Sequence, residues 1–328
     1  MTRTRLFLFL AGLTLLAGLA AWAGMGAVLR ALVLLGAGGL AAITLIHLPV
    51  LLMMGLAWWS VGRDARGARP HRFIAARLVR DCVAEVLPFS QVGGFVGGLR
   101  LLSLLGTDAA AGAFALFADL VIEFAAKLLY ALAGVLALAG LEPGASLLAP
   151  LALGLALAVA AGAAAISLRG QLAVLVDRLA GGMVRRWAPR SGIETGPALA
   201  ACFALSRAAP GFAIHLFCWL FGAAEAWLTF HLMGVPVTAG EALVIDSLGT
   251  TLRTFGFLVP GAAGVQEAAY VLVCALFGLG PAQAVAFSLA RRARDLVIGI
   301  PGLAAWQALE ARAWRRRAEA LDAPSARP

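Results

Sequence analysis

The stretch Val259-Pro260-Gly261-Ala262-Ala263-Gly264-Val265-Gln266-Glu267 decides how this chain folds, because it interrupts two apolar segments while adding almost no charge. Proline has no amide hydrogen to donate and glycine is a poor helix former, so a continuous helix is not expected here. The flanking segments, 243–258 and 268–279, are largely apolar. Such a break is placed at membrane depth only where the protein satisfies the free backbone groups. The stretch therefore predicts a helical hairpin that turns inside the membrane.

The composition is that of a membrane protein. The chain is 62% hydrophobic and 13% charged, with a mean hydropathy of +0.92. A soluble domain of 328 residues does not need so much apolar surface, so we expect an all-α integral membrane protein with several spans. The formal charge of +9 comes almost wholly from arginine. Basic residues in such a protein usually mark cytoplasmic loops against anionic lipid, so nucleic acid is not the expected partner.

Apolar segments and basic loops define a topology for a single transmembrane domain, 1–328. A first span that resembles a signal peptide lacks a convincing cleavage site and is kept as a helix. Basic segments near 74–86 and 172–183 carry apolar residues at helical spacing, which predicts amphipathic helices at the interface or packed on the bundle. The basic loops 62–80 and 169–190 and both termini are expected in the cytoplasm, with a basic, disordered tail at 311–328. The predicted spans are 6–23, 40–61, 109–141, 147–168, 212–233 and 282–309.

A second break suggests an inverted repeat. Leu87-Pro88-Phe89-Ser90-Gln91-Val92-Gly93-Gly94 lies 172 residues before the first, and the same offset aligns Gly106 with Gly278. The loop charges place the two units, about 40–141 and 212–310, in opposite orientations if each break is a hairpin that enters and leaves on one side. Inverted repeats with paired broken helices are typical of alternating-access carriers. We therefore expect a polytopic helical bundle with two re-entrant helical hairpins.

Charged residues inside the apolar spans form the candidate site. An ionised group at the bilayer centre costs about 2.5–3.5 kcal/mol even on a mild scale. Asp119, Glu123 and Lys127 share one helix face and are expected to neutralise one another. Either the charges are internal ion pairs that fix helix register, or they form a polar pathway for a lipid headgroup. The candidate pathway consists of Asp119, Glu123, Lys127, Arg291 and Asp295.

The residues around the two breaks are the candidate substrate-binding residues. Glu267 either caps the helix that follows the break or binds a headgroup or a coupling cation. Gly264 is expected to leave open space, so that leucine in its place would block lipid at near-normal stability. Cys82, Cys202, Cys218 and Cys274 lack metal-site spacing, and His47, His215 and His231 are expected to pack or lie at the interface, so no metal or catalytic residue is predicted. The candidate binding residues are Pro88, Gly93, Gly94, Arg253, Pro260, Gly261, Gly264, Gln266 and Glu267.

The run from Pro260 to Glu267 resembles the Pro-Gly-Gly-x-Gly-x-Arg-Glu signature of the flippase-like transmembrane region of lysylphosphatidylglycerol synthases. The run 87–94 resembles that family's first Pro…Gly-Gly element, and most closely its branch associated with hopanoid biosynthesis. The resemblance covers roughly residues 5–310 and implies a bacterial inner-membrane protein that moves or handles lipids. Ala262 and Gln266 depart from the signature, and the lost arginine favours a less anionic cargo. The family's aminoacyl-transferase domain is not recognised here, so synthase activity is not expected.

Three classes of function remain open on sequence grounds. A lipid translocase or lipid-handling carrier is the principal expectation, with membrane lipids and lipid-biosynthetic enzymes as partners. No Gly-x-x-x-x-Gly-Lys-Ser/Thr run is present, so no nucleotide or other cofactor is expected. An intramembrane lipid-modifying enzyme would need a catalytic constellation, and the chain has no DxxD, HExxH or GxSxG pattern. The third class is a scaffold that holds lipid-biosynthetic enzymes together.

Overall fold

The computed structural model describes residues 25–86, 90–146, 148–167, 201–254, 262 and 264–322, and every regular element in them is an α-helix. Three helices contain apolar segments long enough to cross a membrane, Val28–Gly62, Ala109–Leu141 and Leu205–Leu232. This confirms the prediction of an all-α integral membrane protein. The helices are α2 Met25–Gly62, α3 Pro70–Val86, α4 Ser90–Leu104, α5 Ala109–Leu141, α6 Leu148–Ser167, α9 Leu205–Leu232, α10 Ala239–Arg253, α11 Val265–Ala275 and α12 Pro281–Asp322.

The predicted bounds of two spans compare differently with the structure. The span expected at 40–61 agrees with residues 37–62 of α2, which follow a kink at Gly36, where φ is 59° and ψ is −177°; the segment 25–35 before the kink was not predicted. The last span was expected to end at Leu309 before a disordered tail, but α12 continues to Asp322. Arginine and alanine are good helix formers, so the basic composition of this segment does not end the helix. The predicted span 6–23 and the amphipathic helix near 172–183 lie outside the described residues.

The amphipathic helix α3 packs inside the bundle. Phe73 and Ala76 on this helix are fully buried, and α3 contacts α2, α4 and α12. Its close packing against α4 forms the first predicted helical hairpin, and α10 packs against α11 to form the second. The two hairpins are thus present, and their entry and exit on one side of the membrane stays a prediction.

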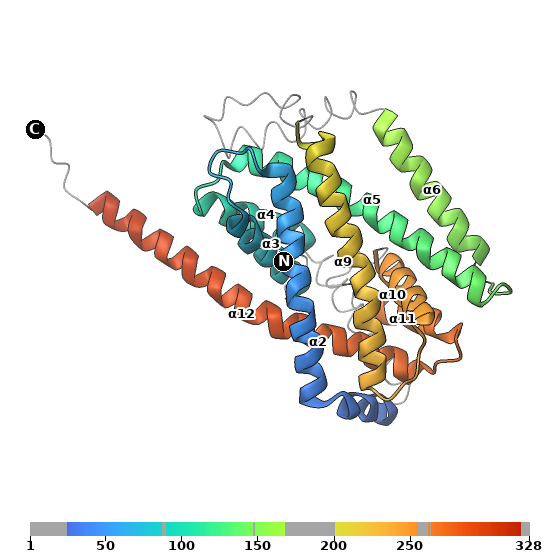
Figure 1. The fold of residues 1–328 in the computed structure, drawn as a ribbon. Coiled ribbons are helices and arrows are strands. Elements are labelled where there is room, and N and C mark those ends of the chain that lie inside the picture. The colour runs from blue at the N-terminus through green and yellow to red at the C-terminus, as the bar shows by residue number, and fades with distance from the viewer. Residues whose placement is uncertain are drawn as a thin grey trace, which may run out of the picture.

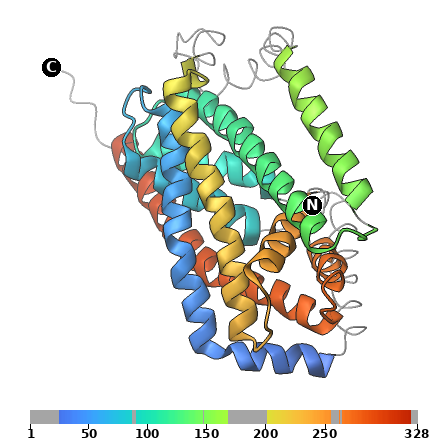
Figure 2. The same ribbon diagram turned by 45° about the vertical axis from the view of Figure 1, so that its right-hand side comes forward.

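The helices follow one another in the same order in two inverted units. The 172-residue offset that aligns the two breaks also places the start of α5, Ala109, on the start of α12, Pro281. Gly106 and Gly278, which precede these helices, both have positive φ angles, 86° and 69°. Figures 1 and 2 show α2 beside α9 and running in the opposite direction, and α5 runs opposite to α12.

The two units also exchange contacts. Helix α5 packs on α9 while α12 packs on α2, and α3 packs on α12 while α10 packs on α5. A pseudo-two-fold axis that relates the units requires this exchange, so the structure agrees with the predicted inverted repeat. Among the described helices α6 stands outside both units, against α5 (Figure 1).

Candidate functional site

Two arginines of α3 bind two carboxylates of α5 in the first unit. The Arg77 guanidinium lies 3.3 Å from Asp119 Oδ2 and 3.1 Å from both Glu123 carboxylate oxygens. Arg80 Nη2 lies 3.1 Å from Glu123 Oε2, and His215 Nε2 of α9 lies 2.8 Å from Asp119 Oδ1. Asp119 and His215 are almost completely buried, with 1% and 0% exposure. The cluster joins the first hairpin to α5 and α9.

This arrangement corrects two sequence interpretations. Arg77 and Arg80 were counted with the cytoplasmic basic loop, but they neutralise Asp119 and Glu123 inside the bundle. The direct pairing expected from Lys127 is not seen among the described residues, where Lys127 Nζ donates to Thr254 Oγ1 at 2.7 Å. Periodicity within one helix found the carboxylates but not their partners on another helix.

Asp119, Glu123 and His215 also place three potential metal-ligand atoms within 4.8 Å of one another. Imidazole and carboxylate groups are common ligands of divalent cations. However, both carboxylates already bind Arg77 and Arg80, so the two guanidinium groups supply the positive charge that a cation would otherwise bring. The geometry therefore favours an ion-pair network over a metal site.

The second unit carries an equivalent ion pair with the signs exchanged. Asp246 on α10 pairs with Arg291 on α12, and Tyr130 of α5 donates to Asp246 Oδ2 at 2.7 Å. The 172-residue offset places Asp119 on Arg291, so equivalent positions carry opposite charges. In the first unit Asp119 pairs with Arg77 of α3, and in the second unit Arg291 pairs with Asp246 of α10. In both units the partner lies on the first helix of that unit's hairpin.

A third ion-pair cluster joins both units through α2, α9 and α12. Glu225 of α9 lies 2.8 Å from His47 Nδ1 of α2 and 2.7 Å from Arg294 Nη1 of α12. Asp295 pairs with the same Arg294 at 2.8 Å. His47 and His215 were expected to pack or lie at the interface; His215 is fully buried, and both histidines also contact carboxylates, which was not predicted. His231 hydrogen-bonds the carbonyl of Trp227 through Nδ1 at 2.9 Å.

The stretch that organises the sequence ends in a buried polar cluster. Glu267 is fully buried, and its Oε2 accepts a hydrogen bond from the Gly264 amide at 2.7 Å. Its Oε1 accepts from Ser288 at 2.8 Å and from Arg292 Nε at 2.7 Å. Gln266 donates to the same Ser288 hydroxyl at 2.8 Å. Glu267 therefore caps α11, as one sequence interpretation held, and also forms an ion pair with α12.

The predicted glycines allow a backbone conformation and a close helix contact in the hairpins that a residue with a side chain would disfavour. Gly264 has a φ of 76°, a conformation that strains any residue with a side chain. The expectation that leucine there would leave stability near normal was therefore wrong. A Cβ atom on Gly94 would lie 2.4 Å from the Arg80 carbonyl oxygen, so glycine permits α4 to approach α3. Gly93 is half-buried beside it. Pro88, Pro260 and Gly261 lie outside the described residues.

One ion pair joins the two hairpins directly. Arg253, at the end of α10, binds both carboxylate oxygens of Glu85, near the end of α3, at 2.8 and 2.6 Å. Each of the two side chains is 27% exposed. Arg253 was predicted as a site residue because it flanks the second break, and the structure identifies its partner on the first hairpin.

Sequence reasoning missed several members of these clusters. Asp246 and Glu225 are isolated acidic residues within apolar helices, and that isolation is itself a signal, since an ionisable residue inside the membrane is a candidate for a functional site. Ser288 and Tyr130 give no comparable signal, because hydroxyl groups are common in membrane helices. The four cysteines are buried and free, as expected for packing residues.

The long apolar helices define a multi-pass membrane protein. Residues 9–302 match the family model described as lysylphosphatidylglycerol synthase TM region. The chain belongs to this family, as its sequence resemblance implied. No curated protein and no solved structure matched the chain.

Proposed function

We propose that this protein is a lipid translocase that passes a lipid headgroup between the two hairpins, without chemical change to the lipid. The observation that carries this proposal is the Glu85–Arg253 ion pair. It lies at the ends of α3 and α10, immediately before the two turns of the hairpins. The pair therefore connects the two hairpins at the point where a headgroup would pass between them in this proposal.

The buried charges suit the passage of a polar headgroup. A charged group in hydrocarbon costs several kcal/mol unless it finds partners. The clusters at Arg77, Asp246 and Glu225 supply both signs of charge on helices from both units. A phosphate takes the place of Glu85 on Arg253, or an ammonium group takes the place of Arg253 on Glu85, with little change in the number of ion pairs. The headgroup thus exchanges its water contacts for ion-pair partners in the protein, and these ion pairs offset the free-energy cost of its desolvation.

The finer assignments are also proposals. The resemblance of the run 87–94 supports a hopanoid or another weakly anionic lipid as cargo, with phospholipid as the alternative. The loop arginines support a bacterial inner-membrane location with both termini in the cytoplasm. Transport against a gradient would draw on an ion gradient or a partner, since the chain has no P-loop.

The test is a leaflet-resolved lipid assay in proteoliposomes with the full chain. We expect the wild type to equilibrate a labelled lipid between leaflets, and Glu85→Gln to change that rate at least severalfold. Asp64→Asn is the matched control, because Asp64 pairs with Arg207 on the surface rather than between hairpins. A wild-type protein that moves no lipid, while binding lipid-biosynthetic enzymes, would support the scaffold instead. Release of a chemically altered lipid would support the enzyme.

A further inference from the structure

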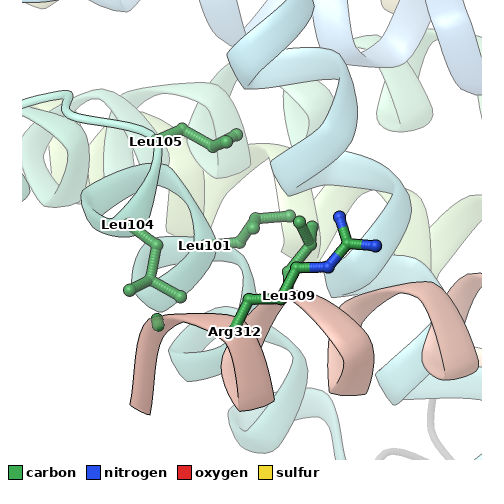
Figure 3. Close-up of a pocket in the computed structure, with 6 residues that line it drawn as sticks. Leu101, Leu104, Leu105, Leu309 and Arg312 are labelled. Carbon is green, nitrogen blue, oxygen red and sulfur yellow. The ribbon is translucent and has the colours of Figure 1, made fainter. Parts of the chain in front are cut away.

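A pocket lies between the C-terminal end of α4 and the C-terminal half of α12. None of the residues that line it belongs to the Glu85–Arg253 pair or to the buried ion-pair clusters. Its volume is about 370 Å³. Figure 3 shows Leu309 and Arg312 of α12 facing Leu101 of α4, with Leu104 and Leu105 completing the apolar wall. The pocket is therefore apolar on one side and basic at its rim.

Arg312 is the group that gives this pocket its charge. The Arg312 side chain has no hydrogen bond or ion pair with any residue in the described part of the chain, and it is exposed. The neighbouring Arg100 differs, because it binds Glu310 at 2.9 and 3.0 Å and fastens α4 to α12 beside the pocket. That ion pair connects the two helices that line the pocket and occupies Glu310, so that Glu310 does not pair with Arg312.

The surroundings place the pocket at the level of lipid headgroups. The turn after α4 is bound to the basic loop, since Thr107 Oγ1 donates to the Gly67 carbonyl at 3.1 Å and the Asp108 amide donates to the Arg66 carbonyl at 3.0 Å. Trp314, one residue beyond the pocket on α12, is 70% exposed. Arginine and tryptophan together are typical of the membrane interface. The leucines then lie on the hydrocarbon side and Arg312 on the aqueous side.

We infer that this pocket binds an anionic phospholipid, with an acyl chain against the leucines and the phosphate on Arg312. The ligand must be amphipathic, because the lining is apolar except for Arg312, which has no ion-pair partner among the described residues. An anionic headgroup fits better than a zwitterionic one, since the described lining has no carboxylate to receive an ammonium group. The site is separate from the proposed transport route and does not depend on it.

The experiment measures lipid retained by the purified full-length protein. Wild type and variants are reconstituted with mixed phosphatidylcholine and phosphatidylglycerol, extracted into detergent and analysed by native mass spectrometry. We expect retained phosphatidylglycerol on the wild type and about five- to tenfold weaker retention in Arg312→Gln. Leu104→Trp, which fills the apolar wall without changing charge, should lower retention similarly. Arg69→Gln is the matched control, because Arg69 is exposed on the nearby basic loop but does not line the pocket.

Each other outcome would overturn the proposal. Equal loss in Arg69→Gln, or full retention in Leu104→Trp, would mean that surface charge alone attracts the lipid. Displacement of the lipid by glycerol phosphate, which has no acyl chain, would exclude the apolar contact. A wild-type protein that retains phosphatidylcholine equally well would exclude the role of Arg312. Thermal unfolding of each variant shows that the comparison is made on folded protein, and transport assays are not needed.

Discussion

Asp119 and Glu123 lie one helical turn apart and share the same two arginines, yet they differ in burial. Asp119 is 1% exposed and Glu123 is 16% exposed. Removal of one partner from a fully buried ion pair costs about 3–5 kcal/mol. We therefore expect Asp119→Asn to lower the free energy of unfolding by about that amount, because it removes the buried negative charge that Arg77, Arg80 and His215 all contact. Glu123→Gln should cost less, about 1–3 kcal/mol, since a glutamine oxygen still accepts a hydrogen bond and Asp119 and Asp81 still neutralise Arg77.

The two substitutions separate a structural role from a transport role. Unfolding of each variant is measured in detergent, and lipid movement is measured in proteoliposomes and divided by the amount of folded protein. If the carboxylates lie on the route, Glu123→Gln keeps most of its stability and loses lipid movement per folded molecule. Asp64→Asn, at a surface pair worth at most about 1 kcal/mol, should change neither quantity. Unchanged movement per folded molecule in both buried variants would show that these charges only fix helix register. A larger stability loss in Glu123→Gln than in Asp119→Asn would refute the argument from burial.

Three further predictions concern topology, backbone and charge. In a background without native cysteines, a cysteine at position 66 should react with an impermeant thiol reagent only from the cytoplasm, and a cysteine at position 143 only from outside. Reaction of both from one side would contradict the opposed orientation of the units. Gly264→Ala should lower the free energy of unfolding by about 1–2 kcal/mol, because Gly264 has a positive φ that strains alanine. Gly280→Ala, at a position without a positive φ, should lower it less. Equal shifts in the melting temperature of the two variants would contradict backbone strain at Gly264. Asp246→Asn and Arg291→Gln should each destabilise by about 3–5 kcal/mol, and the double variant by clearly less than the sum; strict additivity in denaturation would show that the pair is not coupled.

The helices and the repeat were predictable because their signals are local or periodic. The start of α5 at Ala109 agrees with its predicted start, since an apolar run follows a Gly-Thr-Asp turn whose aspartate caps the helix. The offset between the two proline-containing breaks led directly to the inverted units. By contrast, the end of α12 was misplaced, because the basic residues after Leu309 continue the helix as far as Asp322, two residues before Pro324. The helical segment 25–35 before the Gly36 kink was also not predicted.

The partners of the charged residues were not predictable from one sequence. Arg77 and Asp119 are 42 residues apart, and Glu85 and Arg253 are 168 apart. Helical spacing reports which residues share a face, but not which neighbouring helix that face meets. For the same reason Arg77 looked like part of a cytoplasmic loop. Helical spacing predicted an amphipathic helix over 74–86, at the interface or packed on the bundle, but it did not identify Asp119 and Glu123 as the partners of Arg77.

The kink at Gly36 has a consequence for the membrane around the protein. An unbroken helix of 38 residues would be about 57 Å long, nearly twice the hydrocarbon thickness of about 30 Å. The kink turns residues 25–35 aside, so that Val28 and Ala31 join the core of the second unit while Leu29 and Val33 stay exposed. Only residues 37–62, about 39 Å of helix, then remain to cross the bilayer, with the excess taken up by tilt or by the headgroup region. A single glycine thereby sets the hydrophobic length of α2, and with it the bilayer thickness in which this helix is least mismatched.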